Sequence, residues 1–596
     1  MPHADWDGAG SIAVSASFID RDRMLLVPGS TYRGGNWHVP LSWASCVVLR
    51  GVFGAELTLS PSLVSWAARE RKRVERAMEL RELLELPPSA AKGAALISKT
   101  EEESGSSLRL KPFQRVDVAY LITMQTAGLF QPMGAGKTGV AIRTLQVLEA
   151  AGLKPFPALI VAPNSVKTTT WPVELEKWAP KLSFAVVDGS AAARRKKIFQ
   201  RADVTVINWE SVRLHSRVAG YGDIRLTDKD RQPKELNELE PRTVILDEAH
   251  KLNDPKSAQS RAVKFLAHQA VYRFALTGTP VDGEIDDLWG ILHVVAPDWH
   301  PGRMRYMDRW ALTGYSLYGG RAVLGLNPLT EPEFRKVTQP LYRRLPKEIL
   351  LPQLPEKLPV VIRHTPMSAK QSRVYHEMEQ HQLAQLDDLL VAGDGRTAMM
   401  RMMQFASAYA DHVEITSNPV TGKTRYSITL SEPSGKVDDL LELLEEMGEE
   451  PLAVAAVSRQ LVELAAARLL KHGISYGLVT GAQSGDERAE AVRQFQAGET
   501  RVILLTLGAG AEGLTLTRAR VMLFMQEDWS PAVNAQAEDR IHRIGSEIHA
   551  GRGIQVIKQV TPGTVEERKP LVLAAKAGRT EEVLADKDAL RRLLGG

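Results

Sequence analysis

The sequence predicts an α/β protein with two parallel-sheet lobes, helical insertions between them and a small N-terminal α+β module. Short apolar runs alternate with helical patterns, and this alternation occurs twice along the chain. Strands that are buried on both faces and followed by helices are typical of parallel sheets. The expected strands span 158–162, 204–207, 244–246 and 274–276 in the first lobe, and 452–457, 476–479, 502–505, 521–524 and 554–560 in the second.

The chain length indicates several domains. Its 596 residues exceed what one hydrophobic core usually holds. We expect an N-terminal module at 1–86 (strands at 24–27 and 37–40, a helix at 66–85), a linker at 87–107, the first lobe at 108–299, insertions and a hinge at 300–432, the second lobe at 433–580 and a C-terminal helix at 581–596. Within the insertions, 413–415 and 426–428 are expected to pair as a hairpin around the turn at 418–422.

Composition excludes several protein classes. Lys and Arg number 75 against 71 Asp and Glu, so the net charge of +4 gives no general attraction to a polyanion. Cys46 is the only cysteine, which excludes an internal disulfide or a Cys-rich zinc module. The N-terminus lacks a basic-then-apolar pattern, and no apolar run approaches the ~20 residues of a membrane span. We expect a soluble cytoplasmic protein, from a bacterium or a phage-infected cell, with no membrane partner.

A glycine-containing loop predicts phosphate binding. It runs from Gln131 and precedes a helical pattern at 140–148. Backbone N–H groups would face phosphate oxygens, Lys137 would reach the β and γ phosphates, and the Thr138 hydroxyl would join a Mg²⁺ shell. Gln131 replaces the first glycine of the full pattern, so an ordinary glycine-rich turn is the alternative interpretation. The expected nucleotide-binding residues here are Met133, Gly134, Ala135, Gly136, Lys137 and Thr138.

Two further strand ends carry candidate catalytic and coupling residues. Asp247 and Glu248 directly follow an apolar strand, at the edge where α/β sheets bind ligands. Asp247 would hold Mg²⁺ through water, and Glu248 would polarise the attacking water. The alternative is that the two carboxylates only cap the start of a helix. The position of this pair after the phosphate-loop motif argues against that alternative. Thr277, Gly278 and Thr279 follow the next expected strand and are suited to sensing the nucleotide state.

In the second lobe, Arg540 and Arg543 are expected on one face of a helix within 536–545. Two guanidinium groups at this spacing can act on a γ-phosphate, as arginine fingers do. A solvated, charged helix face is the alternative. His250 and His542 are expected to be hydrogen-bonding partners within their motifs rather than metal ligands, because no Cys or His cluster accompanies them.

These motifs, in this order, resemble those of SNF2-type ATPases of helicase superfamily 2. The resemblance covers about 108–568, and 528–531 followed by 536–545 is its most specific part. The segments 112–114, 159–178, 253–257, 343–347 and 354–357 are also similar to this group. Two positions depart from its usual pattern: Gln131-Pro132 replaces the acidic pair that usually precedes the phosphate loop, and Gly508 stands where many members have a basic residue. Residues 513–517 and 527–529 look most like the distant branch that includes annealing helicases, and 37–41 resembles part of the small module of those enzymes.

The resemblance implies two RecA-like lobes, ATP and Mg²⁺ as cofactors, and double-stranded or forked DNA as the partner of a monomer. It adds Gln114, Gly513 and Gln536 to the nucleotide site. It implies backbone contacts with DNA, nonspecific and salt-sensitive, from Lys167, Ser458, Thr480, Gly481, Thr506, Gly510 and Trp529. The basic cluster 194–197 is interpreted instead as a solvated helix face.

The favoured hypothesis is an ATP-dependent duplex DNA translocase that acts in replication, recombination or repair, with proteins of those processes as possible partners. A strand-separating helicase and a nucleotide-gated DNA clamp without useful turnover are the alternatives. A restriction-system motor and a chromatin remodeller are less favoured, because no nuclease-like cluster, methyl-donor loop or histone-reading module is recognisable in the sequence.

Overall fold

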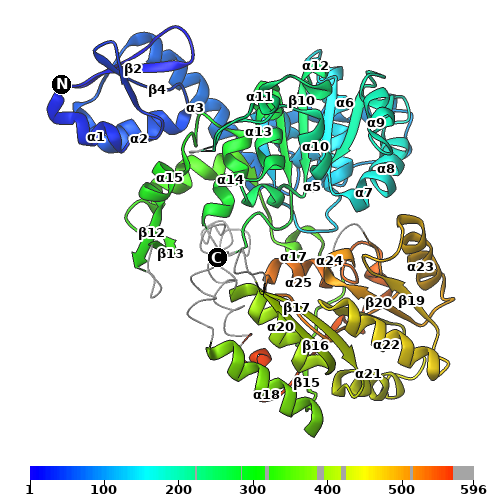
Figure 1. Cartoon of the computed structure of the whole chain (residues 1–596). Helices are drawn as coiled ribbons and strands as arrows, with labels where there is room; N and C mark the ends of the chain where they lie inside the picture. Colours follow the sequence, from blue (N-terminus) through cyan, green and yellow to red (C-terminus); the bar gives the residue numbers. More distant parts are fainter. Residues whose placement is uncertain are drawn as a thin grey trace. The chain divides into compact units, whose positions relative to one another are not determined.

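The structure is a computed structural model (Figure 1), and it describes residues 1–221, 224–282, 285–315, 321–384, 395–417, 424–510, 514–567 and 569. The chain forms two compact units. The first contains Met1–Tyr315 and Arg321–Leu350, and the second begins at Leu351. The boundary therefore falls inside the region expected to hold insertions and a hinge, 300–432, and divides it between the units.

The N-terminal module is a five-stranded sheet of order β3-β4-β2-β1-β5 with helices packed on it. Its elements are β1 (His3–Trp6), β2 (Ser11–Ser15), α1 (Arg21–Leu25), β3 (Thr31–Arg33), β4 (Asn36–Pro40), α2 (Trp43–Phe53), β5 (Thr58–Leu59) and α3 (Pro61–Glu82). The strand predicted at 37–40 and the helix predicted at 66–85 are present. The strand predicted at 24–27 is wrong, since helix α1 covers the start of it and no strand follows there.

This module is not separate from the first lobe, contrary to expectation. Helix α3 packs along α5 (Pro112–Met124), and its apolar residues join the same buried cluster as those of the lobe. Near its C-terminal end, the guanidinium group of Arg343 donates to the carbonyl oxygens of Leu80 and Leu83. The long helix therefore belongs to the lobe as much as to the module.

The predicted linker at 87–107 is also wrong, because it contains helix α4 (Ala91–Glu103). Ile97 and Glu101 on this helix are buried. The Glu101 carboxylate accepts from the Leu110 backbone at 2.8 Å and pairs with Arg115 at 2.7 Å. One residue of the acidic run 101–103, Glu101, is therefore buried and holds the helix in place through its partners Leu110 and Arg115. Because both partners lie outside the run, the run by itself does not indicate this role.

The first lobe is a seven-stranded sheet of order β14-β6-β11-β10-β7-β9-β8, and all its strand pairs are parallel. All four predicted strands are present. The strands are β6 (Thr126–Leu129), β7 (Ala158–Ala162), β8 (Phe184–Val186), β9 (Val204–Asn208), β10 (Thr243–Asp247), β11 (Tyr272–Leu276) and β14 (Tyr342–Arg343). Helices α6 (Lys137–Ala150), α7 (Asn164–Thr169), α8 (Trp171–Trp178), α9 (Ala191–Ile198), α10 (Trp209–His215), α11 (Asp228–Arg231), α12 (Glu235–Leu239) and α13 (Ala258–Gln269) connect them.

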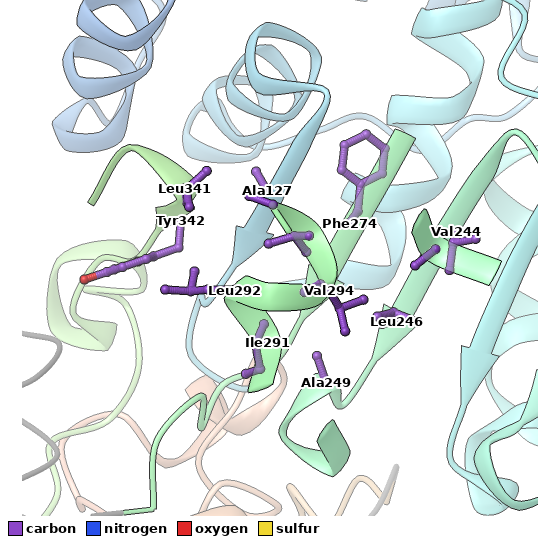
Figure 2. Close-up of a cluster of buried hydrophobic side chains, with 14 of the residues drawn as sticks. Ala127, Val244, Leu246, Ala249, Phe274, Ile291, Leu292, Val294, Leu341 and Tyr342 are labelled. Atoms are coloured by element: carbon purple, nitrogen blue, oxygen red, sulfur yellow. The ribbon is translucent and has the colours of Figure 1, made fainter. Parts of the chain in front are cut away.

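Helix α14 (Ile285–Val295) packs against β6, β11 and the helical turn Ala249–Asn253 that follows β10. Figure 2 shows its side chains Ile291, Leu292 and Val294 among residues of β6, β10, β11 and the segment that enters β14. Burial of apolar area is the main favourable contribution to folding, so this packing fixes the strand ends on which the functional residues lie.

The first unit also contains the elements that follow α14. These are α15 (Arg303–Trp310), the hairpin β12 (Ala311–Tyr315) and β13 (Arg321–Leu326), α16 (Glu331–Thr338) and α17 (Lys347–Leu350). Arg309 pairs with Glu333, which joins α15 to α16.

The second unit is built on a six-stranded parallel sheet of order β15-β22-β21-β18-β20-β19. The five predicted strands are present as β18 (Leu452–Ala456), β19 (Tyr476–Val479), β20 (Val502–Thr506), β21 (Val521–Phe524) and β22 (Gln555–Val560), and β15 (Val361–His364) adds an edge strand from the expected insertions. The helices are α18 (Ala369–Ala384), α20 (Gly395–Ser407), α21 (Gly435–Glu446), α22 (Arg459–Lys471), α23 (Gly485–Ala497), α24 (Leu507–Gly510) and α25 (Pro531–Glu538).

The predicted hairpin in this unit is confirmed. Strands β16 (Tyr409–Ser417) and β17 (Thr424–Ser431) are antiparallel, and Val413 pairs with Ile428 and Ile415 with Tyr426. The turn at 418–422, like the expected C-terminal helix at 581–596, lies outside the described residues. None of the described helices is long and apolar enough to cross a membrane.

Candidate functional site

The predicted phosphate loop lies between β6 and α6, at the carboxyl edge of the first sheet. Gly134 and Gly136 adopt φ angles of 78° and 79°, which L side chains rarely adopt. Gln114 of α5 donates from Nε2 to the Ala135 carbonyl oxygen at 2.9 Å and accepts from the Lys111 backbone at 2.8 Å. The sequence-predicted Gln114 therefore contacts the loop directly and fixes its position.

Lys137 is the first residue of α6, and its ammonium group lies inside the loop. Nζ donates to the carbonyl oxygens of Gln131 at 2.8 Å and Pro132 at 3.1 Å. Thr138 is the next residue of the helix, so its hydroxyl lies at the helix N-terminus, where the dipole favours anions. A phosphate group entering the loop would take the place of the two carbonyl oxygens as the partner of Lys137.

The departure at Gln131 has a structural explanation. Gln131 is completely buried, and its Nε2 donates to Asp117 at 2.8 Å while its Oε1 accepts from the Leu345 backbone at 3.0 Å. Asp117 also forms a buried ion pair with Arg343. One amide both donates and accepts here, which a carboxylate beside Asp117 could not do without repulsion.

Asp247 and Glu248 lie at the end of β10, on the same sheet edge as the loop. Burial and the charge of Glu248 raise the pKa of Asp247 to about 7, while Lys137 opposes that shift. Glu248 has a φ of 52°, so the chain turns sharply between the strand and the next helical turn. A desolvated carboxylate beside a second carboxylate gains from a cation, and carboxylate plus hydroxyl oxygens suit Mg²⁺. Asp247 and Thr138 therefore fit the predicted metal.

The predicted coupling residues connect the acidic motif to the phosphate loop. Thr277 is buried, and its Oγ1 lies 3.2 Å from His250 Nδ1 and accepts from the Thr279 backbone at 3.1 Å. His250 Nδ1 also lies 3.3 Å from the Glu248 carboxylate. A Cβ on Gly278 would lie 3.3 Å from the Met133 backbone nitrogen. This third strand end thus contacts both of the others.

In the second unit, Arg540 and Arg543 follow α25 instead of lying on a helix face. The predicted helix is wrong beyond Glu538, where α25 ends and turns begin. Both guanidinium groups nevertheless contact one atom, since Nη1 of Arg540 and Nη1 of Arg543 lie 3.4 Å and 3.0 Å from the Leu514 carbonyl oxygen. Gln536 is buried on α25, and His542 Nε2 lies 2.9 Å from the Pro355 carbonyl oxygen. Gly513 lies outside the described residues.

Lys167 does not lie where its predicted DNA contact requires. Its side chain is 2% exposed, and Nζ donates to Val187 O at 3.2 Å and Asp188 Oδ1 at 3.0 Å. The residue anchors α7 to the ends of neighbouring strands. This arrangement contradicts the predicted DNA contact of Lys167, because its buried ammonium group is already paired with Asp188.

The DNA-contact residues predicted in the second unit do gather at one sheet edge. Thr480 and Thr506 lie at the carboxyl ends of β19 and β20, and Ser458 follows β18. All three side chains are buried; the Ser458 hydroxyl accepts from the Leu461 backbone at the start of α22, and the Thr480 hydroxyl donates to Gln483 in its own loop. Gly481, which follows Thr480, is exposed, and Gly510 ends α24. Any contact from these loops would therefore use mainly their backbone.

Trp529 is half-buried in the loop before α25. Lys569 Nζ lies 5.1 Å from the centroid of its ring and donates to the Glu527 carbonyl oxygen. Burial lowers the pKa of Lys569 to about 8. This lysine, together with Asp117 of the first unit, was not predicted from the sequence, because each acts through a partner far along the chain.

Comparison with known proteins identifies the family. A SNF2-related domain matches residues 72–413, which is more than half of the chain, and a helicase conserved C-terminal domain matches 435–545. The chain belongs to the SNF2-related family. The first match begins inside α3, in agreement with the packing of that helix on the first lobe. The resemblance predicted from the motifs is thereby confirmed for the family, although not for the annealing-helicase branch.

Individual relatives of this SNF2-related protein include a putative ATP-dependent helicase/translocase of Bacillus subtilis, 27% identical over 81% of this chain and 50% of its own length. An ISWI chromatin-remodeling complex ATPase of Saccharomyces cerevisiae is 24% identical over 77% of this chain and 39% of its own. The chain thus spans half or less of their lengths. A Sulfolobus solfataricus SWI2/SNF2 ATPase core in complex with dsDNA aligns with 82% of this chain and 97% of its own, at 20% identity and a TM-score of 0.36.

Proposed function

We propose that this SNF2-related protein is an ATP-dependent translocase on double-stranded DNA. The observation that supports this most is the convergence of three strand ends on one sheet edge. Lys137 of the phosphate loop, the pair Asp247 and Glu248, and Thr277 all lie there, and His250 links the last two. Ligands of parallel α/β sheets bind at this edge.

Each residue has a separate task in ATP hydrolysis. Lys137 and the backbone of the loop hold the β and γ phosphates, and Gln114 keeps the loop in position. Glu248 accepts a proton from the attacking water, because it is the carboxylate that is left when Asp247 is occupied with the metal. Thr138 and Asp247 would hold Mg²⁺, which would supply charge neutralisation on the phosphates when bound. Thr277 and His250 relay the nucleotide state away from Glu248.

Movement requires a second contribution to the γ-phosphate, which we assign to Arg540 and Arg543. We propose that ATP binding brings them to the nucleotide and that hydrolysis releases them, with alternating grip on the DNA backbone. Gly481, Gly510 and Trp529 are the proposed contacts in the second unit. Backbone contacts carry no base information, so the grip is independent of sequence and weakens with salt.

The proposed biological role is remodelling of replication forks or recombination intermediates, or displacement of proteins from DNA. Support for this role is the sequence similarity of 513–517 and 527–529 to the annealing-helicase branch. The Bacillus subtilis relative is named a putative helicase/translocase, so strand separation is the second candidate.

Steady-state ATP hydrolysis distinguishes these functions. The rate is measured without nucleic acid and with single-stranded, duplex and forked DNA, with Glu248→Gln as the blank. We expect strong stimulation by duplex or forked DNA that is absent in the variant. Stimulation by single strands alone would favour an unwinding helicase, and no turnover under any condition would favour a nucleotide-gated clamp.

A further inference from the structure

Two buried tryptophans donate hydrogen bonds to the same residue of the acidic motif. Trp171 Nε1 donates to Asp247 Oδ2 at 2.9 Å, and Trp209 Nε1 donates to the Asp247 backbone carbonyl oxygen at 2.9 Å. Both side chains are 0% exposed. One indole therefore acts on the carboxylate and the other on the main chain, at the same strand end.

The carboxylate of Asp247 is held at both oxygens. Oδ2 accepts from Trp171, and Oδ1 accepts from the Glu248 backbone at 3.1 Å. An indole N–H can only donate, so it consistently favours the ionised, acceptor form of the carboxylate. Hydrogen bonds to ionised acceptors are about twice as strong as neutral ones. Because the Trp171 side chain is fully buried, its N–H has a fixed direction toward Asp247 Oδ2. Trp171 thus selects one orientation of the group proposed to bind Mg²⁺.

Helix α8 places Trp171 relative to the phosphate loop as well. Trp171 is the first residue of this helix and Trp178 is the last. A Cβ on Gly139, in the first turn of α6, would lie 2.7 Å from the Trp178 ring, so the two helices are in close contact. Helix α8 therefore makes two contacts. Trp178, its last residue, packs on α6, the helix that carries Lys137, and Trp171, its first residue, bonds to the Asp247 carboxylate.

We propose that Trp171 is a positioning residue that orients the Asp247 carboxylate for Mg²⁺ and thereby sets the affinity of the site for Mg²⁺ with nucleotide. This inference rests on the proposed function, since it takes Asp247 as a residue that holds Mg²⁺. Partners that orient metal-binding carboxylates typically change metal affinity by about 10–100-fold when they are lost. Trp209 does not share the role, because the ladder between β10 and β11 also holds the Asp247 backbone in place.

The test is a Mg²⁺ titration of the binding of a fluorescent ATP analogue to the full chain, without DNA. In Trp171→Phe we expect the half-saturating Mg²⁺ concentration to rise about tenfold or more. The matched control is Trp209→Phe, which removes an indole donor from the same residue's backbone and is expected to stay within about twofold of the wild type. A wild-type value in Trp171→Phe, or an equal rise in both variants, would overturn the proposal.

A shape-preserving substitution covers the case in which Trp171→Phe fails to fold. Benzothienylalanine at position 171 keeps the ring system and replaces the N–H by sulfur, so a rise in half-saturating Mg²⁺ supports the hydrogen bond and a wild-type value overturns it. Wild-type nucleotide binding that is independent of Mg²⁺ would contradict the metal assignment of the proposed function itself. Unchanged variants with a Mg²⁺-dependent wild type would contradict only the role of Trp171.

Discussion

Single residues of the phosphate loop combine two constraints, and Gly136 shows both. Its φ of 79° disfavours any side chain, and a Cβ at this position would collide with the Gln114 amide. Gly152 has a φ of 75°, but a methyl group there would have no neighbouring atom within 4 Å. An alanine would therefore strain the backbone at both positions. Only at Gly136 would its methyl group also displace a neighbouring side chain.

We predict that Gly136→Ala raises the dissociation constant for ATP at least about tenfold, because it displaces Gln114 and reshapes the loop. Gly152→Ala is the control and should leave nucleotide affinity unchanged while it lowers the melting temperature slightly. Equilibrium binding of a fluorescent ATP analogue measures the first effect. Equal affinities in the two variants would show that Gln114 does not position the loop.

Residues in short contiguous motifs could be predicted from the sequence, whereas those acting through distant partners could not. Lys137, Asp247 and Glu248 were predicted because the residues that define each motif are only a few positions apart in the sequence. Asp117 pairs with Arg343, 226 positions away, and no local pattern records such a contact. Lys167 shows the converse, since its motif predicted an exposed contact, whereas its ammonium group is buried and pairs with Asp188, 21 positions away.

Among the elements, helix α8 is distinguished by its contact with α6. Gly139 is buried against the Trp178 ring, at a distance that leaves no room for a methyl group. Gly93, on helix α4, would have no atom within 4 Å of such a methyl group. Close helix packing at Gly139 therefore depends on the missing side chain, whereas Gly93 has no such role.

We predict that Gly139→Ala destabilises the chain by about 1–3 kcal/mol, because overpacking forces α6 and α8 apart. Gly93→Ala should be neutral or stabilising by up to about 1 kcal/mol, since alanine is the better helix former. Thermal or denaturant unfolding measures both. A Gly139→Ala variant as stable as the wild type would show that α8 adjusts freely and is not a fixed link between α6 and Asp247.

Elements were predictable where their apolar residues are dense. All nine strands predicted for the two parallel sheets are present, because strands buried on both faces need continuous apolar runs. Helix α4 was missed because its buried anchor, Glu101, is charged. The helix expected to carry Arg540 and Arg543 ends earlier than predicted, at Glu538. Two arginines three positions apart fit a helix, but they also fit the successive turns that are present.

On the scale of the folded chain, two buried histidines, His293 and His300, make stability dependent on pH. Burial lowers the pKa of both His293 and His300 to about 3. In the unfolded chain a histidine titrates near about 6.5. As the pH falls below that value, the unfolded chain takes up protons that the folded chain does not, so stability decreases toward acid pH.

We predict that the melting temperature falls between about pH 6.5 and pH 5, and that it falls less in His300→Phe, which lacks one of these groups. The comparison is made between pH dependences, because the substitution also changes packing against Tyr306. An identical pH dependence in both proteins would contradict the assignment of His300 as a buried neutral group.

On the scale of the whole chain, the SNF2-related match begins earlier than the first lobe that we expected from the sequence. The SNF2-related match begins at residue 72, within α3, whereas we expected the first lobe to begin at 108. Apolar periodicity marks where helices are, but which core a helix joins depends on its tertiary partners. The long helix α3 was therefore predicted as an element and assigned to the wrong body.

Displacement of a triplex-forming strand tests most directly whether this chain moves along duplex DNA when it hydrolyses ATP, as we propose. A third strand bound to a duplex blocks the path and is released by a motor that passes without separating the duplex. We predict ATP-dependent release by the wild type and none by Glu248→Gln. Hydrolysis that is stimulated by duplex DNA but releases no third strand would contradict translocation.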